Sequence, residues 1–82
     1  MKLYIVAYAT TNEDLYITFS TTRTQIFTDE NSAKKHFNAI KAEMKSYNKD
    51  GEYAVIIENE NIYAMTNFDN DGMNVQLFEQ YV

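Results

Sequence analysis

Hydrophobic side chains recur at spacings of four and three residues in the middle of the chain, with polar residues between them. The members of this stripe are Ala33, Phe37, Ile40, Met44 and Tyr47. Residues at this spacing share one face of an α-helix, so the pattern predicts an amphipathic helix of about 18 residues that begins near Asp29. Thr28 is the predicted N-cap because its hydroxyl can accept a hydrogen bond from an orphan backbone N–H. The predicted helix ends before Gly51, because glycine readily adopts the positive φ that often follows the end of a helix.

Runs of aliphatic and aromatic residues on both sides of this helix predict β-strands separated by polar turns. The predicted strands are residues 3–9 and 15–19 before the helix and residues 53–58, 61–66 and 74–81 after it. Residues 24–27 either extend the second strand or form a short third one, and the pattern leaves both alternatives open. The predicted fold is therefore α+β, with a single antiparallel sheet of five or six strands packed on one central helix in the order ββ(β)αβββ.

Composition indicates one small domain that spans residues 1–82. Hydrophobic residues make up 45% of the sequence, which is enough for a folded core despite a net charge of −5. There is no cysteine, which excludes a disulfide framework and suits a reducing compartment. Residues 1–20 have no basic segment followed by an apolar core, and no apolar run approaches the roughly 20 residues of a membrane helix. We therefore expect a cytoplasmic protein without a membrane segment.

Residues with catalytic or metal-binding chemistry are sparse. His36 is the only histidine, and its place beside the apolar stripe predicts an imidazole either at the edge of the core or in solvent. Residues 67–72 copy the first half of a calcium loop, but the twelfth position of that loop is Phe78, where a bidentate glutamate is needed. We predict an ordinary hairpin turn there instead. The sequence thus indicates neither an enzyme nor a bound metal or cofactor.

Charge is distributed unevenly along the chain. Five of the seven basic residues lie in the predicted helix or at its C-terminal end, namely Lys34, Lys35, Lys41, Lys45 and Lys49. From residue 50 onward there is no Lys or Arg, and the acids are Asp50, Glu52, Glu58, Glu60, Asp69, Asp71 and Glu79. Such an acidic surface would steer the protein towards a basic partner. The alternative is that these charges only keep the protein in solution.

One helix is too narrow to cover the whole predicted sheet. A helix about 10 Å across covers two or three strands, whereas five or six strands span about 24–29 Å. We therefore expect some of the strand tyrosines to lie at the surface, where Tyr often serves protein interfaces. The candidates are Tyr4, Tyr8, Tyr16 and Tyr63. The alternative is that Tyr simply favours strands on a solvated face.

The predicted function is that of a non-catalytic protein-interaction module. The predicted partner-binding residues are the turn acids and the strand tyrosines: Glu58, Glu60, Asp69, Asp71, Tyr4, Tyr8, Tyr16 and Tyr63. In size, acidity and richness in Asn and Tyr, the chain resembles small accessory proteins of phages and mobile elements. The uneven charge and the surplus of aromatic surface lead us to predict an inhibitor that occupies the basic, nucleic-acid-binding surface of a host protein. The alternatives are an RNA-binding module that uses the lysine-rich helix face, and a homodimeric or larger homo-oligomeric structural protein.

Overall fold

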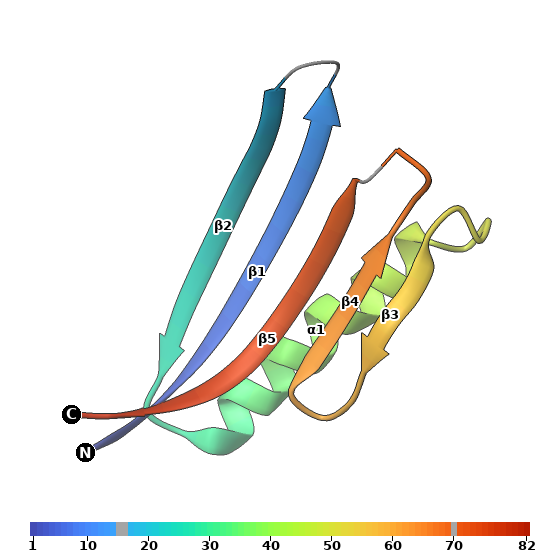
Figure 1. The fold of residues 1–82 in the computed structure, drawn as a ribbon. Helices are drawn as coiled ribbons and strands as arrows, with labels where there is room; N and C mark the ends of the chain where they lie inside the picture. The colour runs from blue at the N-terminus through green and yellow to red at the C-terminus, as the bar shows by residue number, and fades with distance from the viewer. Residues whose placement is uncertain (15–16, 70) are drawn as a thin grey trace.

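A computed structural model describes the backbone of residues 1–14, 17–69 and 71–82, and the side chains of these residues outside 13–20. Within this part of the chain, five antiparallel strands form one sheet and one helix packs on it (Figure 1). The elements are β1 (Lys2–Asp14), β2 (Ile17–Phe27), α1 (Glu30–Tyr47), β3 (Ala54–Glu58), β4 (Ile62–Thr66) and β5 (Gly72–Tyr81). The predicted α+β fold is confirmed, and residues 24–27 extend β2.

The order of strands across the sheet is β2-β1-β5-β4-β3. β3, β4 and β5 form an antiparallel meander, and β5 then pairs with β1, so that the two ends of the chain lie side by side (Figure 1). The amino group of Met1 donates to the carbonyl oxygen of Val82, and the N–H of Val82 donates to the carbonyl oxygen of Met1, both at 2.8 Å. This central pairing of β1 with β5 leaves β2 and β3 as the two edges of the sheet.

The helix is capped by Asp29. Its Oδ2 accepts hydrogen bonds from the backbone N–H and the hydroxyl of Ser32, both at 2.8 Å. These hydrogen bonds lower the pKa of the Asp29 carboxyl, and the charged carboxylate suits the positive end of the helix. The predicted N-cap at Thr28 is therefore wrong, because a charged acceptor stands one residue further on. Beyond the C-terminal end, Gly51 has the predicted positive φ, at +73°.

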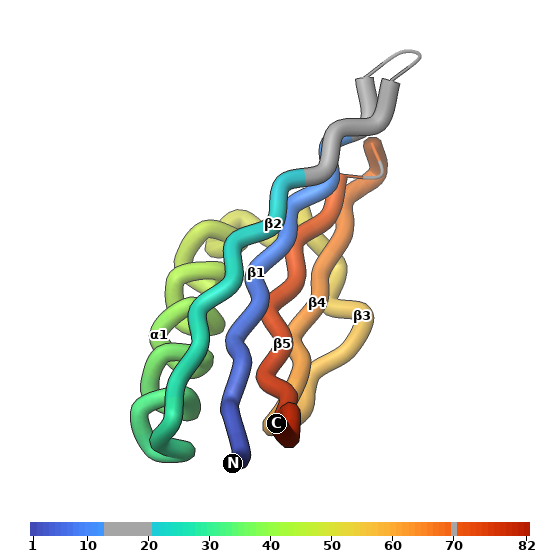
Figure 2. The backbone as a smooth tube through the Cα atoms, turned by 90° about the vertical axis from the view of Figure 1, so that its left-hand side faces the viewer, coloured from blue at the N-terminus to red at the C-terminus, as the bar shows by residue number. Residues whose placement is uncertain are grey.

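The core lies between α1 and one face of the sheet (Figure 2). The helix contributes Ala33, Phe37 and Met44, which are buried members of the predicted stripe. The sheet contributes Val6, Tyr63, Met65, Val75 and Leu77. The molecule measures 44 × 27 × 16 Å, so it is a thin, two-layer structure. Figure 2 shows that the other face of the sheet has no covering element among the described residues.

Candidate functional site

The four acidic residues predicted to bind a partner fall into two groups at opposite ends of β4. Glu58 and Glu60 lie at the turn between β3 and β4, and Asp69 and Asp71 lie at the turn between β4 and β5 (Figure 1). β4 has five residues, so about 17 Å of extended chain separates the two turns. The predicted acidic residues therefore do not form one continuous surface.

Glu58 joins β3 to the helix. Its Oε2 lies 2.7 Å from the Nζ of Lys45 and 3.0 Å from the Nζ of Lys41. The hydrogen bonds from Lys45 and Lys41 lower the pKa of the Glu58 carboxyl, and the bond to Glu58 raises the pKa of Lys45. The side chain of Glu60, two residues further on, is exposed. A partner would therefore meet the exposed carboxylate of Glu60 at the surface, whereas Glu58 is already engaged with the helix.

The turn between β4 and β5 has the hairpin geometry that the sequence predicts. The Oδ1 of Asn67 accepts hydrogen bonds from the backbone N–H of Asp69 at 2.9 Å and of Asp71 at 3.0 Å. The backbone N–H of Asn67 also donates to the carbonyl oxygen of Asp71 at 3.0 Å. Among the residues that the structure describes, which exclude Asn70, no three His, Cys, Asp or Glu side chains are grouped to hold a metal ion. Asn67 thus orders this turn through its own side chain.

The expectation of a surface position is wrong for Tyr63. Its side chain is only 2% exposed and packs in the core. The ammonium groups of Lys41 and Lys45 lie 5.7 and 5.5 Å from its ring centroid. The reason is the strand register: Tyr63 pairs with the buried Val75, and so it points to the helix side of the sheet.

The other predicted tyrosines do not form an exposed aromatic surface either. Tyr4 and Tyr8 alternate with residues of the open face and share the helix side of β1 with Val6. Both are half-buried and pack against the core. Tyr16 lies outside the described residues. Among the described tyrosines of the prediction, none therefore offers a fully exposed ring to a partner.

Exposed aliphatic side chains concentrate on β3, at one edge of the sheet. Val55, Ile56 and Ile57 are 48%, 61% and 43% exposed. The helix cover ends at the neighbouring strand, because Met65 of β4, which pairs with Val55, is buried. A register shift between Val55 and Ile57 leaves Ile56 as a β-bulge. Val55, Ile56 and Ile57, together with the outward backbone of β3, are called the β3 edge below.

Carboxylates flank the β3 edge on both sides. Glu52 precedes the strand and Glu60 follows it, and both side chains are exposed. No ion pair involves either of them within the part of the chain that the structure describes. The site therefore combines an apolar centre with an exposed carboxylate beyond each end of the strand. Glu52 and Glu60 are called its acidic flanks.

The start of β3 is fixed to the end of the helix by Asn48. The Nδ2 of Asn48 donates to the carbonyl oxygen of Tyr53 at 3.0 Å, and the backbone N–H of Tyr53 donates to the Oδ1 of Asn48 at 2.8 Å. The rings of Tyr47 and Tyr53 also pack together, with centroids 5.8 Å apart. Burial and a hydrogen bond with Tyr47 raise the pKa of Tyr53. Together with Glu58, these contacts hold both ends of β3 against α1.

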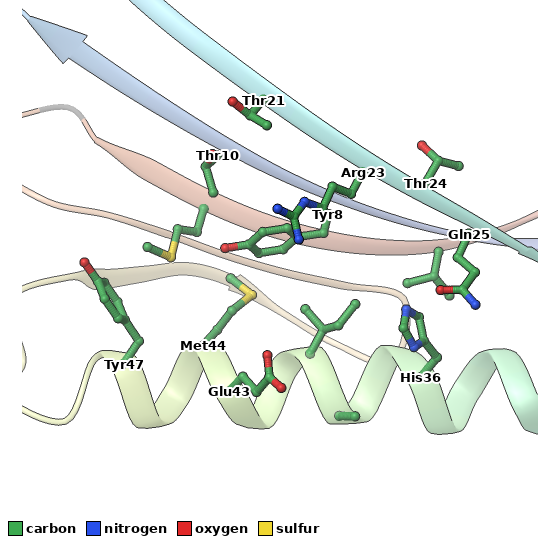
Figure 3. Close-up of a pocket in the computed structure, with 14 residues that line it drawn as sticks. Tyr8, Thr10, Thr21, Arg23, Thr24, Gln25, His36, Glu43, Met44 and Tyr47 are labelled. Atoms are coloured by element: carbon green, nitrogen blue, oxygen red, sulfur yellow. The ribbon is translucent and has the colours of Figure 1, made fainter.

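An open groove of about 900 Å³ lies between α1 and the β1–β2 hairpin (Figure 3). Its lining includes Val6, Met44 and Met73, together with Arg23 from β2 and Glu43 from α1. Figure 3 shows Arg23 and Glu43 approaching from opposite walls, but no ion pair joins them in the described part of the chain. The groove has room for a ligand, yet its polar side chains do not converge on one point.

His36 lines the same groove. Its ring is half-buried and lies 5.4 Å from the ring of Phe27, measured between centroids. Of the two predicted positions, the structure shows the one at the edge of the core. A nucleophilic site needs a hydroxyl, a base and a third group that orients the base. Within the described residues no hydrogen bond or ion pair joins His36 to a hydroxyl or a carboxylate, so the groove lacks that arrangement in this structure.

The β3 edge was not predicted as a binding surface, although the run of aliphatic residues that forms it is visible in the sequence. Val55, Ile56 and Ile57 are three consecutive aliphatic residues and do not alternate with polar ones. Such a run is typical of a strand buried on both faces. Only the order of strands across the sheet identifies it as an exposed edge.

No protein-family model, curated protein or solved structure matches the chain. Among the described residues, no helix has the length and apolar character that crossing a membrane requires. The function is therefore inferred from the residues and the geometry of this chain alone.

Proposed function

We propose that the protein is a non-catalytic protein-binding module that binds a basic surface of another protein through the β3 edge. The observation that carries this proposal is the exposure of three consecutive aliphatic side chains on an edge strand. Natural proteins blunt their sheet edges with charged residues, proline, covering segments, short strands or β-bulges, because an open edge invites pairing with another chain. β3 is short and bulged, but its exposed side chains at Val55, Ile56 and Ile57 carry no charge. An apolar edge that is left open fits a surface whose cover is a partner.

Charge supports a basic partner. The acidic flanks Glu52 and Glu60 are exposed, and the sequence has no Lys or Arg after residue 49. A negative surface raises the rate of encounter with a positive one, and salt weakens this attraction. Where the basic surface of the partner serves to bind nucleic acid, its occupation would inhibit the partner. A cytoplasmic setting suits this proposal, because the chain has no cysteine.

The lysine-rich helix face is the weaker candidate for a binding surface. Lys34 pairs with Glu30 at 3.0 Å, and Lys41 and Lys45 both pair with Glu58. These pairs reduce the positive charge that the helix presents to phosphate groups, and RNA binding depends on such charge. The β3 edge with its acidic flanks is therefore favoured over the helix face.

The test is affinity capture from a lysate of the native host with the wild type and two lysine variants as bait. Ile56→Lys places a charge on the β3 edge, and Thr22→Lys makes a comparable charge change on the exposed β2 edge. We expect one protein to be retained at low salt by the wild type and by Thr22→Lys, released at high salt, and not retained by Ile56→Lys. Circular dichroism checks that both variants fold.

Equal capture by the two lysine variants would show that the β3 edge does not bind the partner. Retention of RNA instead of a protein would favour the helix face. In that case the loss of RNA from a double variant, Lys35→Ala with Lys49→Ala, would locate the binding surface, since these two lysines have no ion pair among the described residues.

A further inference from the structure

We propose, building on the function proposed above, that the β3 edge binds its partner by strand addition. The occupant is an extended segment of another protein that pairs antiparallel with β3, has aliphatic side chains at its centre and carries Lys or Arg at both ends. In strand addition, the free backbone groups of the edge provide affinity, and pockets for alternate side chains provide specificity. The β3 edge offers both of these, and its acidic flanks add a requirement for charge.

The backbone of β3 is paired on one side only. It pairs with β4 and is the last strand in the order β2-β1-β5-β4-β3. Among the described residues, no backbone hydrogen bond outside this ladder involves residues 54–58. The bulge at Ile56 bends the strand, which limits the regular edge to about five residues, or about 17 Å. A short segment therefore fits this edge better than a long strand, and the antiparallel direction continues the pattern of the sheet.

The side chains of the β3 edge reach both faces of the sheet. Val55 pairs with Met65, which faces the helix, and Ile57 pairs with Ala64, which does not belong to the core. An added strand places successive side chains on opposite faces. Its aliphatic residues would thus contact Val55 on one face and Ile57 on the other. The centre of the segment is therefore expected to be apolar without alternation.

The acidic flanks determine the charge at the ends of the segment. Glu52 lies before β3 and Glu60 lies after it, and both side chains are exposed. A strand centred opposite Ile56 brings its two ends near these two carboxylates. Opposite charges across a strand pair stabilise it, and like charges destabilise it. Lys or Arg at both ends is therefore favoured, and acidic residues there are excluded.

The same geometry argues against a second copy of this chain as the occupant. In a symmetric antiparallel pair of β3 with itself, the end of one copy that carries Glu52 would lie near the end of the other copy that carries Glu60. Each copy also carries a net charge of −5. Repulsion between like charges therefore opposes pairing of β3 with itself. A basic segment avoids this repulsion and gains two favourable contacts.

The probe for this proposal is a blocked peptide, Arg-Thr-Arg-Val-Ile-Val-Thr-Thr-Arg, titrated into the protein by calorimetry. Two methylated peptides keep every side chain. One carries N-methyl groups on both valines, and the other carries them on the isoleucine and on the threonine that follows the second valine. These amides point to opposite edges of an extended peptide, and only one edge can face β3. We expect one methylated peptide to bind at least about tenfold more weakly than the parent, and the other to bind within about threefold of it.

Protein variants test the charge requirement and the location. The double variant Glu52→Gln with Glu60→Gln is expected to bind the parent peptide several-fold more weakly and with a flatter salt dependence. Ile56→Lys is expected to lose at least about tenfold in affinity, and Thr22→Lys less than about threefold. Equal losses for the two methylated peptides, or no loss for either, would overturn strand addition. Protein binding at the β3 edge would still stand in that case if Ile56→Lys alone weakens the interaction.

Two further outcomes would also contradict the proposal. If Ile56→Lys and Thr22→Lys bind the peptide equally well, neither strand addition nor the β3 edge explains binding. If sedimentation shows a wild-type dimer that Ile56→Lys converts to a monomer, a second copy occupies the edge and the basic segment is the wrong occupant. We expect the wild type to sediment as a monomer.

Discussion

The two edges of the sheet differ in chemistry. β2 presents a mostly polar border, because residues 21–25 are Thr, Thr, Arg, Thr and Gln and all are exposed. Ile26, which is 60% exposed, is the one exposed aliphatic side chain among the described side chains of this strand. β3 presents Val55, Ile56 and Ile57, which are exposed as well. Polar and charged side chains on an edge disfavour pairing with another chain, whereas exposed aliphatic ones favour it. The comparison supports the proposal that β3, and not β2, is the edge that a partner covers.

The two edges also differ in how they are held. β2 pairs with β1 from Tyr4–Phe27 to Asp14–Ile17, whereas β3 is a five-residue strand with a bulge. The short ladder of β3 is supplemented by contacts between the helix and both ends of the strand, through Asn48 and Glu58. A rigid edge loses less entropy on binding than a mobile one. The contacts with the helix are therefore expected to serve binding as well as stability.

The largest effect on stability is expected from a core residue of α1, because the helix supports both edges of the sheet. Phe37 is a fully buried side chain of α1 in the core that lies beneath the sheet. Phe37→Ala is expected to lower the free energy of unfolding by about 3–5 kcal/mol, because it removes buried contacts and leaves a cavity. Thermal or urea unfolding measures this loss. A loss below about 1 kcal/mol would show that α1 contributes little to the stability of either edge.

A smaller effect, confined to one edge, is expected from Asn48. Asn48→Ala removes both hydrogen bonds that join the helix to Tyr53 at the start of β3. We expect a loss of about 1–2 kcal/mol in the free energy of unfolding, with faster amide hydrogen exchange in β3 and unchanged exchange in β2. Asn38→Ala is the matched control, since Asn38 is exposed on the same helix. Equal acceleration of exchange in β2 and β3 would contradict an edge-specific role of Asn48.

The smallest effect is expected from the ion pair at the other end of β3, and it depends on pH. Hydrogen bonds from Lys45 and Lys41 hold the pKa of the Glu58 carboxyl below its ordinary value of 4.5. This contribution to stability is therefore present above pH 4.5 and is lost as the pH falls through the lowered pKa. The difference in melting temperature between the wild type and Glu58→Gln is expected to shrink towards zero between about pH 6 and about pH 3. Glu43→Gln is the control, and a constant difference for Glu58→Gln would contradict the role of this ion pair.

Local features of the fold could be predicted from the sequence. The helix follows from the spacing of Ala33, Phe37 and Met44, because the 3.6-residue period depends only on neighbours along the chain. The turn at Asn67 follows from residues that favour tight turns and hydrogen-bond their own backbone. The N-cap was missed by one residue, since Thr28 and Asp29 are both good caps and the sequence alone does not rank them.

The candidate site depends on distant pairings and could not be predicted in the same way. The side of the sheet to which Tyr63 points is fixed by its pairing with Val75 of β5. The exposure of Ile56 follows from β3 being an edge, which in turn results from β5 pairing with β1 at the far end of the sequence. The carboxylate of Glu58 forms ion pairs with two lysines of α1, which are distant from it along the sequence. A run of aliphatic residues between acids therefore had no visible function until the strand order was known.

Amide hydrogen exchange with and without the basic peptide tests most directly whether β3 is the binding edge. The account predicts that the peptide slows exchange at amides of residues 54–58 and leaves residues 21–27 of β2 unchanged. The two lysine variants provide the control, because Ile56→Lys is expected to lose this protection and Thr22→Lys to keep it. Protection that appears on β2 or on the groove-facing side of α1, and not on β3, would contradict the account.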